Sequence, residues 1–128
     1  MMISFLPGLL WIAFLSSAAA PVLYPQCENP APDERRPYML CVTETDFEIA
    51  DARLDRQWRR TLTDVTRSRG LKAKKQLLAE QRKWLRNRDR ECDAVAASSP
   101  VTQSGRNQMS CLAQKTEART AELMHMVH

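Results

Sequence analysis

The stretch Gln81-Arg82-Lys83-Trp84-Leu85-Arg86-Asn87-Arg88-Asp89-Arg90-Glu91-Cys92 decides the fold of this chain. Read as a helix, it brings residues at spacings of three and four onto one side: Gln81, Trp84 or Leu85, Arg88 and Cys92. An amide and a guanidinium therefore interrupt an otherwise apolar face. Because buried polar groups need partners, the helix that packs against this face should supply an acid. Asp51 occupies the matching face of the preceding helical segment.

Helical periodicity continues upstream and downstream of this stretch. The segment Thr43-Glu44-Thr45-Asp46 is typical of a helix start, and apolar residues keep the helical period from Phe47 to Val65. Gly70 suits a turn at the end of that helix. A second helix should then run from about residue 71 to residue 95, with an inner stripe of Leu71, Leu78, Gln81, Leu85, Arg88, Cys92 and Val95.

A third helix follows a polar loop. Ser98-Ser99-Pro100 stops the second helix, and residues from Pro100 to Asn107 form the expected loop. The third helix runs from about Asn107 to Met126, and no strand pattern is present. The sequence predicts an all-α fold: an antiparallel helical hairpin plus a third helix, disulfide-linked, with an extended N-terminal arm.

The hairpin allows a prediction of which residues face each other. If two antiparallel helices turn near residues 69 and 70, facing positions should sum to about 139, which places Asp51 level with Arg88. A bidentate carboxylate–guanidinium pair is expected there, with Gln81 and Arg119 as further members of a polar network. We interpret this network as fixing the register of the helices. A catalytic Asp51 would need a cleft and a second reactive group, and the sequence identifies neither.

The N-terminal region predicts export. Residues 1–20 combine an apolar run with the small residues Ser16 to Ala20, which is typical of a signal peptide, although no Lys or Arg precedes the run. Cleavage is expected after Ala18 or Ala19, and a retained N-terminal anchor is the alternative. Residues 21–40 form a proline-rich arm before the helical domain of residues 41–126. The residues before Cys27 lack a lipoprotein signature, so we expect a periplasmic or secreted protein that meets the membrane only through the signal segment.

The four cysteines predict two disulfides, because their number is even and the expected compartment is oxidising. Cys92 closes the second helix and Cys111 opens the third, which favours their pairing and leaves Cys27 to Cys41. The competing arrangement joins Cys41 to Cys92 or Cys111. A zinc site is the rival interpretation, but the spacings contain no CxxC and no paired His, so we expect no metal and no cofactor.

The chain is basic, with a formal net charge of +4 at pH 7. Much of the excess lies between residues 53 and 90. It can form an ordinary solvated helical surface or a face for an anionic envelope partner. Export and the lack of aromatic residues among the basic ones argue against nucleic acid.

Four blocks of sequence carry a resemblance to a known family. They are Cys41 with Ala50-Asp51…Leu54; Gln81…Trp84…Arg88-Asp89…Cys92; Cys111-Leu112; and Thr116…Arg119-Thr120…Leu123. In content and spacing they resemble the LprI-type lysozyme inhibitor family of small exported bacterial proteins. The chain departs from the family pattern in two places: in the first helix Asp55 stands for Asn and Trp58 stands for Tyr, and the usual Gly-Gly-Ser loop is reduced to Gln103-Ser104-Gly105.

The resemblance implies a non-enzymatic inhibitor whose partner is a lysozyme or related muramidase. Such enzymes cleave peptidoglycan with two carboxylic acids in a groove, and an inhibitor need only fill the groove and offer donors to those acids. The expected target-binding residues are in the polar loop: Ser104, Gly105, Arg106 and Asn107. Repulsion between this basic chain and a cationic lysozyme should slow their encounter, so that added salt speeds it. The alternative function is a non-enzymatic binding or structural protein of the periplasm that uses a basic helical face for an anionic envelope partner.

Overall fold

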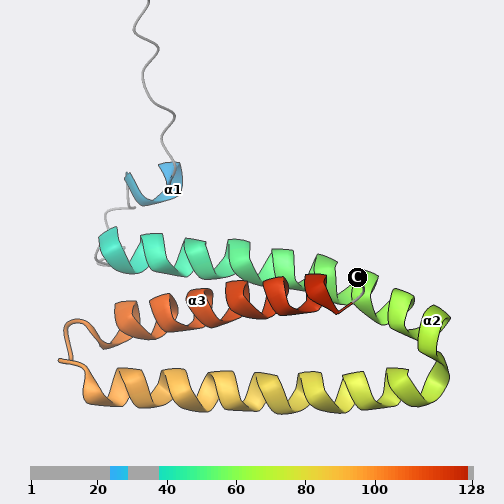
Figure 1. Ribbon diagram of the computed structural model, residues 1–128. Helices are drawn as coiled ribbons and strands as arrows, with labels where there is room; N and C mark the ends of the chain where they lie inside the picture. Colours follow the sequence, from blue (N-terminus) through green and yellow to red (C-terminus); the bar gives the residue numbers. More distant parts are fainter. Residues whose placement is uncertain (1–23, 29–37, 127–128) are drawn as a thin grey trace, which may run out of the picture.

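The structure is a computed structural model that describes residues 24–28 and 38–126 (Figure 1). It contains three helices: α1 (Pro25–Glu28), α2 (Tyr38–Ser98) and α3 (Ser104–His125). No described residue is in a strand, and the all-α prediction is confirmed. The expected signal segment of residues 1–20 lies outside the described residues. Of the expected arm, only residues 24–28 and 38–40 are described, and they are largely helical rather than extended.

Gly70 divides α2 into two arms. Its φ of 84° and ψ of −175° are not helical, so the chain reverses there between an N-terminal arm (residues 38–69) and a C-terminal arm (residues 71–98). This backbone region is open essentially only to glycine. The expected turn at Gly70 is thus present, and we call this part of the molecule the turn end.

The third helix completes the bundle by lying between the two arms of α2 (Figure 1). The apolar core occupies the half nearer the turn end and consists of Leu54, Val65, Leu77 and Leu123, with Trp58, Leu62, Ala73, Trp84 and Met126 packed against it. The helical hairpin with a third helix that the periodicity predicted is therefore confirmed.

Two helix starts differ from prediction. The first long helix begins at Tyr38, several residues before the expected cap, and the Thr43 hydroxyl donates backward to the carbonyls of Met39 and Leu40. A threonine inside a helix makes this bond, so the capping interpretation was wrong. The third helix begins at Ser104 and not near Asn107. The connection between α2 and α3 is therefore only residues 99–103.

The inner stripe predicted for the second helix was out of phase by one residue at several positions. Leu77, not Leu78, is fully in the core, and Trp84 rather than Leu85 faces inward. Leu71, Leu85 and Val95 are exposed. The phase of the C-terminal arm follows from the inward placement of Gln81 and Cys92, because these side chains must meet partners on α3.

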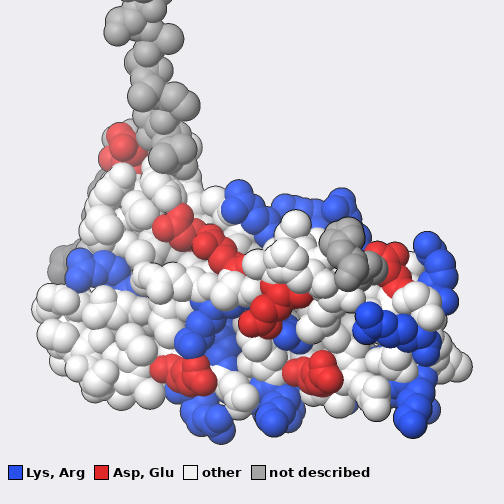
Figure 2. All heavy atoms as spheres, viewed as in Figure 1, with Lys and Arg blue, Asp and Glu red and all other residues white. Residues whose placement is uncertain are grey.

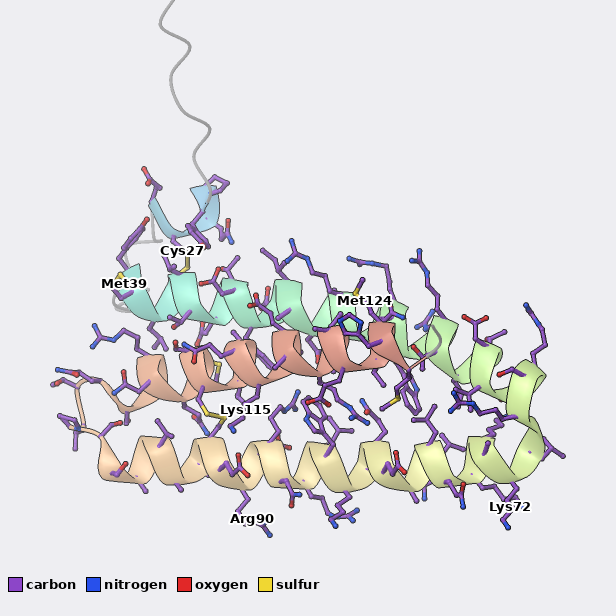
Figure 3. All side chains as sticks on the ribbon, viewed as in Figure 1. Cys27, Met39, Lys72, Arg90, Lys115 and Met124 are labelled. Carbon is purple, nitrogen blue, oxygen red and sulfur yellow. A yellow bond between two sulfur atoms is a disulfide. The ribbon has the colours of Figure 1, made fainter. Side chains whose placement is uncertain are left out.

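Two disulfides hold the end of the bundle opposite the turn end. Cys27–Cys41 ties α1 to α2 with a Cα–Cα distance of 5.7 Å, and Cys92–Cys111 ties the C-terminal arm to α3 at 5.6 Å. The sequential pairing is the arrangement present (yellow bonds in Figure 3). The Tyr24 hydroxyl also donates to Asp46 at 2.5 Å. This hydrogen bond raises the pKa of the Tyr24 phenol and adds a second tie between the N-terminal segment and α2.

Candidate functional site

Two guanidinium groups flank Trp84 in the middle of the bundle. The Arg88 guanidinium lies 5.3 Å and that of Arg119 lies 5.8 Å from the indole centroid, and Arg88 also lies 5.4 Å from the Phe47 ring. All three distances are within the range of cation–π attraction. The expected polar network thus consists of two parts separated by an aromatic ring, which sequence spacing alone did not indicate.

Arg119 forms the buried part of this network. Its Nε donates to the Gln81 side-chain carbonyl at 3.0 Å, and its Nη1 lies 2.9 Å from Glu122. Its buried Nη2 has no acceptor within the described residues. Because Gln81 and Arg119 are both buried, their hydrogen bond fixes α3 against the C-terminal arm.

Arg88 forms the second part and reaches across to the N-terminal arm. Its Nη1 lies 3.9 Å from Asp51, so the two residues are level as the register argument required. Closer partners are Asp89 at 2.9 Å and the Thr116 hydroxyl at 3.2 Å. The Arg88 side chain is 10% exposed, whereas that of Asp51 is 60% exposed. The buried charge of this pair is therefore the guanidinium, and a separation of 3.9 Å is too long for the bidentate hydrogen bonds that the sequence predicted.

A shallow groove runs beside this network between the C-terminal arm and α3. It is lined by Trp84, Asn87, Arg88, Glu91, Lys115, Ala118 and Glu122. Lys115 lies between the two helices (Figure 3) and pairs with Glu91, which lowers the pKa of that carboxyl. Glu91 and Glu122 are both paired with cations.

The described residues contain no group of three or more His, Cys, Asp or Glu side chains able to hold a metal ion. None of the helices they form is both long and apolar enough to cross a membrane.

The four expected target-binding residues lie on the first turn of α3 rather than in a loop. Ser104 and Gly105 begin the helix, and the Asn107 side-chain amide donates to the Ser99 hydroxyl at 3.0 Å across the connection. A Cβ on Gly105 would lie 3.3 Å from Leu40, so α3 approaches the N-terminal arm closely there. No side chain caps the start of α3, which leaves its first backbone N–H groups available.

The stretch of chain that leads into this turn, from the last turn of α2 to Gly105, carries no charge. Residues 94–105 contain no Asp, Glu, Lys or Arg, and Val101 at the tip of the connection is 93% exposed. Figure 2 shows a white surface over the α2–α3 connection at the left, in contrast to the blue and red atoms elsewhere. We call residues 94–105 the uncharged end. The uninterrupted run of uncharged residues was the signal in the sequence that could have revealed it.

The sequence of this bundle matches one family model, described as lysozyme inhibitor LprI, over residues 27–123. The chain belongs to the LprI lysozyme inhibitor family. The match begins at the first cysteine and includes both disulfides, the Gln81–Arg119 bond and the uncharged end. The resemblance inferred from the four sequence blocks is thus confirmed. No curated protein and no solved structure matches the chain significantly.

Proposed function

We propose that this LprI-family protein is a non-enzymatic inhibitor of a lysozyme-type muramidase that inserts its uncharged end into the active-site groove. Family membership over residues 27–123 is the observation that carries the proposal. It supplies the class of target, and the geometry of the uncharged end suggests the mode of binding. The exported location that this function requires is part of the same proposal.

The uncharged end is suited to binding because it is held in one shape. The Cys92–Cys111 disulfide, the Asn107–Ser99 hydrogen bond and the close packing of Gly105 against Leu40 all restrain it. A connection of five residues between two helix ends leaves little freedom to lose. Binding by a preorganised surface avoids an ordering cost of about 0.5–1.5 kcal/mol for each flexible side chain.

The chemistry of this end, together with that of Arg106 directly after it, complements a pair of carboxylic acids. The first backbone N–H groups of α3 lack a side-chain cap, and the partial positive charge of a helix N-terminus favours carboxylates. Arg106 and Ser104 add a guanidinium and a hydroxyl on the same turn. Val101 would enter first, because its side chain is almost fully exposed in the connection and carries no polar group that would need a partner.

The distribution of charge modifies the expected repulsion from a cationic lysozyme. The positive excess lies near the turn end, and each arm of about 30 residues separates the two ends by roughly 40–45 Å. The Debye length is about 8–10 Å near physiological ionic strength, so charges at the turn end are screened from a partner at the uncharged end. We therefore expect salt to speed association only at low ionic strength, on the order of 10 mM, where the Debye length approaches 30 Å.

The test is inhibition of cell-wall lysis by lysozymes of several structural classes. The double variant Ser104→Ala/Arg106→Ala should keep its helical content and lose inhibition. Ser68→Ala/Arg67→Ala is the matched control, because it removes the same side-chain types from exposed positions near the turn end. Equal inhibition by the two double variants would refute docking through the first turn of α3. Full activity of every lysozyme at stoichiometric protein would refute the function itself.

A further inference from the structure

The turn end concentrates the positive charge of the protein. Residues 59–75 carry a net charge of +6, although the whole chain carries only +4. The only acid among them is Asp64. Arg59 pairs with Asp55, but the other six cations have no ion pair within the described residues: Arg60, Arg67, Arg69, Lys72, Lys74 and Lys75. Blue atoms accordingly gather at the right of Figure 2, over the Gly70 turn.

An exposed leucine stands among these cations. Leu71 follows Gly70 directly and is 69% exposed, although the helical period had placed it on the inner stripe. The positive φ of Gly70 sets the direction in which the C-terminal arm leaves the turn, and Leu71 is left outside the core. Lys72, the next residue in the sequence, points outward in Figure 3. We call residues 67–75 the basic tip.

A groove lies next to the basic tip. It is lined by Leu62, Thr63, Thr66, Arg67 and Lys74 and has a volume of about 320 Å³. The hydroxyls of Thr63 and Thr66 already donate to the carbonyls of Arg59 and Leu62. Arg67 and Lys74 are therefore the groups that would receive a phosphate in this groove.

We propose that the basic tip docks on the surface of a bilayer that contains anionic phospholipid. Cations attract the acidic headgroups, and an apolar side chain at the centre of a cationic cluster can enter the headgroup region. A soluble polyanion would engage the cations equally well but would give no role to exposed Leu71. A bilayer accounts for both observations, and the groove between Arg67 and Lys74 fits one headgroup phosphate.

This docking is independent of muramidase inhibition and uses the opposite end of the molecule. A protein seated on its basic tip would hold the uncharged end roughly 40 Å from the bilayer, given the helical rise over an arm of about 30 residues. The surface that we propose for the muramidase would then face away from the membrane.

The test is co-sedimentation with vesicles of phosphatidylcholine alone and of phosphatidylcholine mixed with phosphatidylglycerol. The protein is recovered from the periplasm of an expression host, and all variants share the same N-terminal residues. The wild type should bind only the mixed vesicles and should dissociate as salt rises. Each cation near an anionic bilayer strengthens binding about fivefold, so Lys72→Glu/Lys75→Glu should weaken it at least about 25-fold. Leu71→Ser should weaken binding severalfold without any change of charge.

The matched control is Arg82→Glu/Lys83→Glu, which makes the same change of charge on exposed residues of the same arm, away from the tip. It should bind nearly as well as the wild type, because residue 82 is roughly 10 Å along the helix from residue 75, the end of the tip, which is about one Debye length. Circular dichroism checks that each variant keeps its helices. Equal loss in the control, equal binding to neutral vesicles, or binding to soluble polyphosphate but not to vesicles would each overturn the proposal.

Discussion

Gly70→Ala tests whether the turn that sets up the whole bundle depends on one backbone conformation. At φ 84° and ψ −175°, Gly70 occupies a region that residues with a Cβ adopt only with strain of about 1–3 kcal/mol. No atom lies within 4 Å of the position that a Cβ would take, so steric contact with neighbours does not contribute. Alanine also lowers the entropy of the unfolded chain, which stabilises the folded state by about 0.4–1 kcal/mol and offsets part of this strain. The net loss of stability should be about 1–2 kcal/mol.

The assay is urea unfolding followed by circular dichroism, with light scattering to check that both proteins have the same oligomeric state. A loss of this size should also lower the Tm by about 5–10 °C, given the usual dependence for domains near 100 residues. The control is Gly105→Ala, because that glycine has no positive φ and its Cβ would meet only the flexible end of Leu40. We expect Gly105→Ala to change stability by less than about 1 kcal/mol. An unchanged free energy of unfolding for Gly70→Ala would refute the reasoning about the turn.

Three further predictions follow from the contacts in the bundle. Arg88→Ala should lower the free energy of unfolding, measured by denaturation, by on the order of 2–4 kcal/mol. The substitution removes a nearly buried side chain from two aromatic rings and from Thr116. Asp51→Ala should lower the free energy of unfolding by less than about 1 kcal/mol, because its carboxylate is exposed. Equal losses for the two variants would contradict the assignment of Arg88 as the buried charge of the pair. Cys92→Ser/Cys111→Ser should lower stability by about 3 kcal/mol, and a loss below about 1 kcal/mol would show that the cross-link does not hold the uncharged end. Lys115 lowers the pKa of Glu91, so this pair should contribute stability above the ordinary pKa of 4.5 and lose it as the pH falls through the lowered value. The measurement compares the free energy of unfolding of wild type and Glu91→Gln from pH 7 to pH 2. The difference between the two proteins should vanish at the acid end of this range.

The helical architecture could be predicted from the sequence because it rests on periodicity and on one glycine. The turn at Gly70 and the spacing of Asp51 and Arg88 were sufficient to place the arms of α2 level with each other. The identity of the buried charge could not be predicted, since helical spacing gives facing positions but not their depth. Arg88 is enclosed by Phe47 and Trp84, and Asp51 lies at the edge of the same contact.

The boundaries of α3 and the phase of the C-terminal arm were harder to predict. Asn107 looked like the start of a helix, yet the chain had already become helical at Ser104. The difference arises because Gly105 packs directly against Leu40, a contact between segments far apart in sequence. In the same way, Leu71 kept the helical period but is exposed, because the direction of the arm after Gly70 is a tertiary property. Both corrections fall at the two ends of the bundle, where the proposed binding surfaces lie.

The central claim is that the uncharged end enters the groove of a muramidase, and Val101→Asp tests it most directly. Val101 is 93% exposed, so the substitution should leave the free energy of unfolding unchanged. In the proposed complex the new carboxylate would be buried beside the two acids of the enzyme, which should cost on the order of 3 kcal/mol or about 100-fold in the inhibition constant. The measurement is that constant for wild type and variant against a lysozyme that the wild type inhibits. A loss of about this size with an intact fold is the predicted result, and equal inhibition by the two proteins would contradict the account.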